Sequence, residues 1–211
     1  MNAKQIFTTL AAFALLMATS CNGQDVKTHG RASQANNLKS QNMSKSIVIF
    51  FSHAGDNYSV GVIDTGNTKI VADYISEITG ADQFEIVTHK YDGMAYTPLI
   101  ELAKEEARKG ELPPYEGTAP DLSGYDTVYI GGPVWWGTYP QIMFTLFKDI
   151  NLDGKTVIPF TTHEGSGLAS CAKDVRKAFP KANVTGEFSI YGHEVRGGKA
   201  KVERWLKGIR G

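Results

Sequence analysis

The feature that most constrains the fold is a regular alternation that begins at residue 45. Short apolar runs of strand length alternate from there to the C-terminus with stretches in which apolar residues recur at helical spacing. The expected strands are residues 46–51, 83–87, 127–132, 156–160 and 187–192. Strands that alternate with helices form a parallel sheet with helices on both faces. The sequence therefore predicts an α/β fold, a three-layer doubly wound sandwich around a five-stranded sheet.

Local signals place the ends of the helices between these strands. Gly80 is expected to end the first helix, since glycine readily adopts the left-handed conformation at a helix C-terminus. Thr97 and Pro98 read as the cap and first turn of a helix that runs to about Lys109, and Ser166 reads as the cap of a later helix. Pro140 opens a short helix, and the last helix places Val202, Trp205, Leu206 and Ile209 on one face.

The N-terminal residues have the pattern of an export signal. Residues 6–18 contain 11 apolar residues out of 13, follow Lys4, and are too few to span a bilayer as a permanent helix. Small residues then precede Cys21, as in the lipobox of bacterial lipoproteins, although Ala18 stands where leucine is usual. We expect residues 1–21 to be a signal peptide and lipobox with lipidation at Cys21. The alternative is an ordinary secretory signal that is cut near Ser20.

The polar segment that follows predicts a tether to a membrane. Residues 22–44 contain no aromatic side chain and few large apolar ones, so they cannot offset the entropy cost of ordering. We therefore expect a flexible tether at 22–44 and a single domain at 45–211. The expected location is outside the cytoplasm, facing the periplasm or the cell surface, with a lipid anchor as the sole membrane contact.

Charge and cysteine content exclude several classes of protein. The chain carries 22 basic and 22 acidic side chains, so it lacks the basic excess of a nucleic-acid-binding protein. If Cys21 carries lipid, Cys171 has no partner for a disulfide, and its apolar surroundings predict a small buried thiol. The loops after the strands show neither paired carboxylates nor a Cys/His cluster at metal spacing, so no metal site is expected.

The first loop of interest precedes the first helix. Ligands of doubly wound sheets bind beyond the carboxyl ends of the strands. There, residues 61–68 read GVIDTGNT, which fits the nucleotide P-loop pattern except that Asn67 replaces the lysine. A triphosphate site is therefore not expected, but backbone N–H groups at a helix N-terminus can hold a monophosphate. The alternative, that Thr65 or Asn67 merely caps the helix, stays open at this point.

Two further loops follow the third and fourth strands. Trp135 and Trp136 lie between Pro133 and Gly137, where a flat aromatic ligand could stack, although both rings could instead pack on the core. Residues 161–167, TTHEGSG, add hydroxyl groups and glycines, and His163 alone would more often be structural. A phosphate cradle, an aromatic wall and a polar glycine-rich loop together describe a site for flavin mononucleotide (FMN).

These motifs resemble those of the flavodoxin family. The resemblance extends over residues 45–209 and rests on Gly66-Asn67-Thr68 combined with Pro133-Val134-Trp135-Trp136-Gly137. It implies a sheet of order 2-1-3-4-5 and bound FMN, with Ser52 and residues 66–68 at the phosphate and residues 133–137 and 161–167 around the isoalloxazine ring. In the family pattern the serine and the G-N-T triplet are nearly contiguous, whereas residues 53–65 intervene here. We expect this segment to loop out and to bring His53 or Asn57 to the rim of the ligand.

The predicted cofactor-binding residues form one set. They are Ser52, His53, Thr65, Gly66, Asn67, Thr68, Pro133, Val134, Trp135, Trp136, Gly137, Thr161, Thr162, His163, Gly165, Ser166 and Gly167. Thr161 and Thr162, together with the backbone amides of residues 135–137, are expected near the ring nitrogens. The flavin supplies the redox chemistry, so no side chain is assigned as catalytic.

Three functions remain open on sequence alone. The first is an FMN-dependent oxidoreductase that acts on a small acceptor such as a quinone. The second is a flavodoxin-type one-electron carrier that serves a protein partner, against which the near-zero net charge speaks. The third is an interaction module that kept the fold without a cofactor.

Overall fold

The computed structural model describes residues 45–210. The predicted signal peptide and lipobox at 1–21, Cys21 among them, and the predicted tether at 22–44 lie outside the described residues, as does Gly211. Within residues 45–210, no helix has both the length and the apolar character needed to span a bilayer.

The centre of the fold is a parallel sheet whose order is the predicted one. β1 (Ser46–Phe50) lies between β4 (Asp82–Glu85) and β5 (Thr127–Pro133), and β6 (Thr156–His163) pairs with the other side of β5. The outer position is shared by β7 (Asn183–Val184) and β8 (Phe188–Tyr191), which both pair with β6. Counted along the chain, the five positions read 2-1-3-4-5, which confirms the predicted fold class.

The interrupted outer strand explains a proline in the middle of the sheet. β7 pairs with Thr156 and Val157, and β8 pairs with residues 160–163. Pro159 therefore lies where β6 has no partner on its outer side, so the N–H that proline lacks is not needed there. The prediction of one continuous strand at 187–192 missed β7, because the chain turns at Gly186 with φ 66° between the two short strands.

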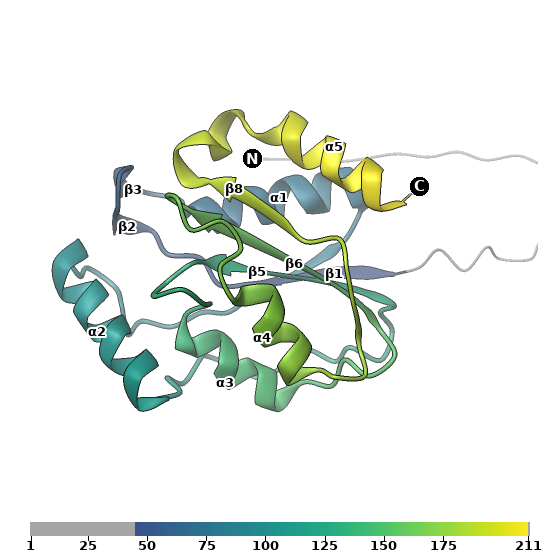
Figure 1. Ribbon diagram of the computed structural model, residues 1–211, viewed down its shortest axis with the longest axis horizontal. Helices are drawn as coiled ribbons and strands as arrows, with labels where there is room; N and C mark the ends of the chain where they lie inside the picture. The colour runs from purple at the N-terminus through teal and green to yellow at the C-terminus, as the bar shows by residue number, and fades with distance from the viewer. Residues whose placement is uncertain (1–44, 211) are drawn as a thin grey trace, which may run out of the picture. The chain divides into compact units, whose positions relative to one another are not determined.

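Helices cover both faces of the sheet, as the alternation predicts (Figure 1). α1 (Asn67–Thr79) and α5 (Lys199–Arg210) lie on one face, while α2 (Tyr96–Lys109), α3 (Gln141–Asp149) and α4 (Cys171–Ala178) lie on the other. The buried side chains separate accordingly, since Ile47 and Ile49 of β1 join one core cluster and Val48 and Phe50 join the other. A short 3₁₀ helix, η1 (Gly192–Gly197), links β8 to α5.

Two predicted helix starts are wrong. α2 begins at Tyr96, so Thr97 lies inside the helix rather than at its cap, and the carboxylate of Asp56 accepts the hydrogen bond of the Tyr96 N–H at 2.9 Å. α4 begins at Cys171, and residues 166–170 form turns, with Ala169 at φ 45°. Ser166 therefore does not cap a helix. In both places a tertiary contact or a loop replaces the local cap.

Two other local predictions are confirmed. Gly80 ends α1, at φ 74°. Cys171 is fully buried, and this burial raises the pKa of its thiol to about 12.

The inserted segment forms an element that the sequence did not predict. β2 (Gly55–Asn57) and β3 (Gly61–Ile63) pair as an antiparallel hairpin that is separate from the main sheet. Figure 1 shows this hairpin at the same end of the molecule as the beginning of α2. The segment does loop out before α1, as expected.

Candidate functional site

A cavity of about 320 Å³ opens where the central strands end. Its walls come from the loops after β1, β5 and β6, from the hairpin, and from α1, α2 and η1. The lining residues are His53, Asp56, Asn57, Tyr58, Asn67, Thr68, Tyr96, Leu99, Ile100, Ala103, Pro133, Val134, Trp135, Trp136, Thr162, His163, Glu164, Ser166 and Gly192. Its volume falls in the usual range of small-molecule sites, roughly 300–1,000 Å³.

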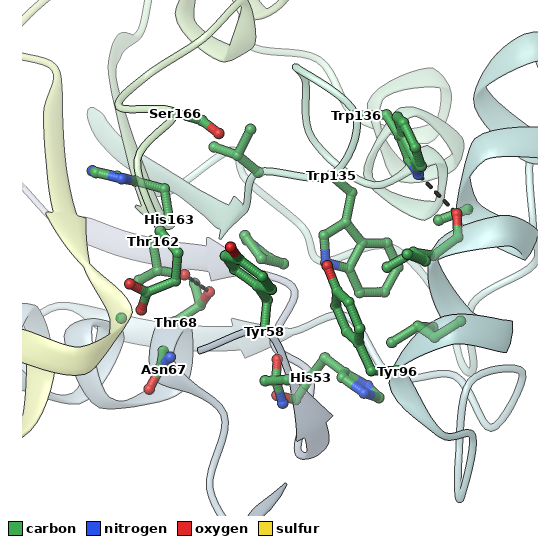
Figure 2. Close-up of a pocket in the computed structure, with 18 of the residues that line it drawn as sticks. His53, Tyr58, Asn67, Thr68, Tyr96, Trp135, Trp136, Thr162, His163 and Ser166 are labelled. Carbon is green, nitrogen blue, oxygen red and sulfur yellow. Dashed lines mark hydrogen bonds between the residues drawn. The ribbon is translucent and has the colours of Figure 1, made fainter. Parts of the chain in front are cut away.

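One end of the cavity is polar and lies at the N-terminus of α1. The first backbone N–H groups of a helix have no acceptor within the helix, and the dipole of α1 favours an anion there. Thr68 is 1 % exposed, and its Oγ1 lies 2.8 Å from Oγ1 of Thr162, which joins the start of α1 to the end of β6. Figure 2 shows Asn67, Thr68, Thr162 and Ser166 on this side of the cavity.

Behind the cavity wall, Ser52 and Gly66 hold the start of α1 in place. Ser52 Oγ accepts a hydrogen bond from the Lys69 N–H at 3.0 Å, so this hydroxyl caps the helix from another loop. A Cβ on Gly66 would lie 2.2 Å from that Oγ and 2.7 Å from the His53 carbonyl oxygen. Glycine is therefore required at position 66 by the close approach of the β1 loop.

The two tryptophans of the second loop have different surroundings. Trp136 and Gly137 both have positive φ, and the backbone groups of Trp135 and Thr138 are paired, which is the geometry of a type I′ turn. The ring of Trp135 packs edge-on against Phe51, Tyr91 and His53, with centroids 5.3–5.9 Å apart.

Trp136, in contrast, is 50 % exposed. Its Nε1 donates a hydrogen bond to the Ile100 carbonyl of α2 at 2.8 Å, which ties the loop to that helix. Both tryptophans line the cavity. Trp135 therefore both packs on neighbouring aromatic rings and forms part of the cavity wall.

The third loop is held by its own hydrogen bonds. Thr161 Oγ1 donates to the Gly167 carbonyl at 2.9 Å, and the Gly165 N–H donates to His163 Nδ1 at 2.9 Å. Gly165 has φ 123°, a conformation that favours glycine. These bonds fix the loop that presents His163 and Ser166 to the cavity.

The hairpin and α2 form the remaining wall, at the aromatic end. Tyr58 at the hairpin turn stacks on Tyr96, with ring centroids 5.7 Å apart and an angle of 30° between the planes. Asn57 Nδ2 donates to the Gly55 carbonyl at 3.0 Å and stiffens the hairpin. Figure 2 shows Tyr96 together with Trp135 and Trp136 on the side of the cavity opposite to the polar residues.

Burial and acidic groups set the electrostatics of the cavity. The lining contains no Lys or Arg within the part of the chain that the structure describes, while Asp56 and Glu164 are acidic. Desolvation lowers the pKa of His53, which is 7 % exposed and whose Nε2 has no hydrogen-bond partner among the described residues. Desolvation also lowers the pKa of His163. Both imidazoles are therefore expected to be neutral near pH 7. No group of three or more potential metal ligands occurs within residues 45–210.

The predicted site residues divide into lining and supporting groups. The cavity is lined by His53, Asn67, Thr68, Pro133, Val134, Trp135, Trp136, Thr162, His163 and Ser166. The others, which do not line it, are Ser52, Thr65, Gly66, Gly137, Thr161, Gly165 and Gly167. Asn57, expected at the rim, does line it.

Sequence reasoning missed the wall that α2 contributes. Tyr96, Leu99, Ile100 and Ala103 recur at helical spacing and line the cavity together. Their helical periodicity predicts an apolar face on this helix. The sequence does not show whether that face lines a cavity or packs in the core. Asp56, Tyr58 and Gly192 also line the cavity and were not predicted, and Glu164 lies in the predicted loop at 161–167 but was not named as a binding residue.

This chain belongs to the flavodoxin family. Residues 45–209 match the family described as flavodoxin. No match was found among curated proteins.

Solved structures share the fold. A protein assigned as a flavoprotein from Bacteroides eggerthii is 25 % identical, with a TM-score of 0.60, and the match covers 80 % of this chain and 99 % of that one. A similarly assigned protein from Bacteroides uniformis is also 25 % identical, with a TM-score of 0.59 and coverage of 78 % and 98 %. A flavoprotein from Lactobacillus acidophilus, solved in complex with FMN, is 20 % identical, with a TM-score of 0.55 and coverage of 77 % and 99 %. At that identity the last match shows the fold alone.

The buried imidazole of His53 generates a prediction about pH. The pKa of His53 in the folded protein lies below the unfolded value of 6.5. Well above pH 6.5 the imidazole is neutral in both the folded and the unfolded protein, so it does not change the free energy of unfolding with pH. As the pH falls below about 6.5 the unfolded state binds the proton first, and the free energy of unfolding decreases until the folded pKa is reached. We expect His53→Gln to lose less stability than the wild type between pH 7 and pH 5 in urea unfolding.

His89 provides a control of opposite sign. Its hydrogen bond to Asp92 raises its pKa, so the stabilisation is present at low pH and is lost as the pH rises. His89→Gln should therefore lose more stability than the wild type on acidification. Parallel pH profiles for wild type and His53→Gln would contradict the assignment of a buried neutral imidazole.

Proposed function

We propose that this protein is an FMN-dependent oxidoreductase that passes electrons to a small acceptor such as a quinone. FMN is the cofactor of the flavodoxin family, to which this chain belongs. The Lactobacillus acidophilus flavoprotein was solved in complex with FMN. The observation that carries the proposal is a single cavity with an anion-favouring helix N-terminus at one end and aromatic walls at the other.

The residues present fit FMN. Asn67, Thr68 and the first N–H groups of α1 would hold the phosphate without a cation, as helix N-termini do, and Gly66 keeps the backbone close. The loops at 133–137 and 161–167 would frame the isoalloxazine ring. FMN, when bound, supplies the hydride or electron transfer. The side chains of this protein would orient the ring and keep water away from it.

The shape of the aromatic end supports an enzyme that encloses its reaction. The hairpin is anchored to α2 by the Asp56 carboxylate, and Tyr58 stacks on Tyr96 beside the cavity. Covering a reaction site excludes water and positions a small substrate. A carrier that docks on a protein partner would instead gain from an open ring edge.

The cofactor assignment is tested by Thr68→Val. The purified wild type should show flavin absorption bands, or take them up from added FMN. Loss of a hydroxyl that bonds a charged phosphate costs about 1.5–3 kcal/mol, so the dissociation constant of FMN should rise roughly tenfold to a hundredfold. The measurement is a titration of FMN fluorescence quenching.

Two further variants separate binding from folding. Thr68→Ser keeps the hydroxyl and should retain FMN. Thr79→Val makes the same change at the other end of α1, where the hydroxyl bonds the Ile75 carbonyl, and should leave FMN affinity unchanged. A protein that stays colourless after FMN is added would favour the cofactor-free interaction module and sink this proposal.

A one-electron carrier is the second candidate. Trp136 and Tyr191 are 50 % and 41 % exposed, and exposed aromatic side chains of this kind favour docking of a partner. Reductive titration of the FMN-loaded protein distinguishes the two functions. We expect a single two-electron midpoint potential and rapid reoxidation by a quinone. Two well-separated one-electron potentials with slow quinone reduction would favour the carrier.

We also propose that the protein is an exported lipoprotein attached through Cys21. Support comes from residues 6–21 alone. In a bacterial host, Cys21→Ala should move the protein from the membrane fraction to the soluble fraction and abolish incorporation of labelled fatty acid. An unchanged distribution would favour an ordinary secretory signal. Outside the cytoplasm a membrane quinol or another protein, rather than NAD(P)H, would be the expected electron donor.

A further inference from the structure

The apolar half of the cavity lies outside the segments that are predicted to bind FMN. It consists of one face of α2, formed by Leu99, Ile100 and Ala103, together with Tyr58 and Tyr96. The predicted phosphate residues lie at the start of α1, and the predicted ring loops follow β5 and β6. Leu99 and Ala103 are only 3 % and 5 % exposed, so the surface that a second molecule could contact comes mainly from Ile100 and the two tyrosines.

The hairpin is fixed against α2 rather than left free. Asp56 Oδ2 accepts the N–H of Tyr96 at 2.9 Å, across 40 positions of sequence. The stacked rings of Tyr58 and Tyr96 form a second contact between the two elements, and the Asn57 amide bonds the Gly55 carbonyl within the hairpin. These contacts build a wall of fixed position beside the cavity.

The charge of this wall selects against anions. The N-terminus of α2 would by itself attract an anion, but the carboxylate of Asp56 already occupies it. Asp56 itself lines the cavity, and no Lys or Arg does so among the described residues. A negatively charged ligand would meet repulsion from Asp56 without a compensating cation, whereas a neutral ring would meet apolar and aromatic surface.

One polar side chain at the base of this wall is almost fully buried. His53 lies at the base of the hairpin, lines the cavity and is 7 % exposed. Its Nε2 has no hydrogen-bond partner among the described residues. Because that nitrogen is itself buried, the wall offers a ligand mainly apolar and aromatic surface, and a neutral, planar, largely apolar ring such as a quinone has the matching composition.

We propose that the β2–β3 hairpin and α2 form a binding site for a neutral quinone and that Asp56 makes this site discriminate against anionic acceptors. This inference rests on the proposed oxidoreductase function. The reaction balances when the quinone gains two electrons and two protons from the reduced flavin, which returns to oxidised FMN as the quinone becomes a hydroquinone. Asp56 and Tyr58 act as specificity and positioning residues.

The test is equilibrium binding to the oxidised, FMN-loaded protein, in which no turnover occurs. Calorimetry compares 2-methyl-1,4-naphthoquinone, which is neutral, with 1,4-naphthoquinone-2-sulfonate, which is an anion of similar ring size. We expect the neutral quinone to bind at least about tenfold more tightly, since one unscreened like charge at a partly buried site has an effect of that order.

Variants identify the residues responsible. Asp56→Asn keeps a hydrogen-bond acceptor for the α2 N-terminus but removes the charge, so the ratio of the two dissociation constants should fall at least about fivefold. Tyr58→Ala should weaken binding of the neutral quinone by about tenfold, through loss of aromatic contact, while the dissociation constant of FMN changes by less than about twofold. Val62→Ala is the matched control, because Val62 is a 79 % exposed residue of the same hairpin and does not line the cavity.

The outcomes separate this inference from the proposed function. If the protein takes up FMN but both quinones bind equally, or if Asp56→Asn leaves their ratio unchanged, the quinone site is overturned and the flavoprotein assignment stands. If Tyr58→Ala releases FMN, the hairpin belongs to the cofactor site and the inference is again overturned. If no FMN is bound at all, the proposed function fails and this inference fails with it.

Discussion

The parallel pairing of β1, β5 and β6 is the constraint on which the rest of the structure depends. Because all three strands run in one direction, the loops that follow them emerge at the same edge of the sheet. Both faces of the sheet must be shielded from water because the strands are apolar on both sides. One face is covered by α1 and α5, and the other by α2, α3 and α4 (Figure 1). The hydrogen bond between Thr68 and Thr162 then ties the start of α1 to the end of β6. A helix N-terminus, which by its dipole favours anions, thus lies beside two loops from distant parts of the sequence.

The cavity uses polarity rather than cations to sort its ligands. At one end, the start of α1 favours an anion, and the adjacent hydroxyl and amide groups of Thr68, Thr162 and Asn67 are neutral. At the other end, the start of α2 is already neutralised by Asp56. Two helix N-termini therefore face one cavity with opposite preferences. The α1 end therefore favours a phosphate, and the α2 end favours a neutral apolar group.

The inserted hairpin gives the aromatic end its character. Without residues 53–65, the first strand would lead almost directly into Gly66, and the face of α2 would lack the wall that Tyr58 and Asp56 supply. Trp136 joins the same wall through its bond to the Ile100 carbonyl. Two of these contacts come from the hairpin and one from the loop after β5, and all three converge on the first turns of α2. This convergence favours a protein that encloses a small reactant over one that presents its cofactor to a large partner.

The sequence by itself determined the class of the fold, the order of its main elements and the three loops that meet at the site. Those properties follow from hydrophobic periodicity and from glycine, proline and small polar residues, which act over short distances along the chain. Only the tertiary structure decided that Asp56 rather than Thr97 caps α2, that Ser166 faces the cavity instead of starting a helix, and that Leu99, Ile100 and Ala103 line the cavity. Each of these depends on contacts between segments far apart in the sequence, such as the 40 positions between Asp56 and Tyr96. Local patterns carry no information about such partners, because an apolar helix face or a free carboxylate reads the same whatever it meets in space.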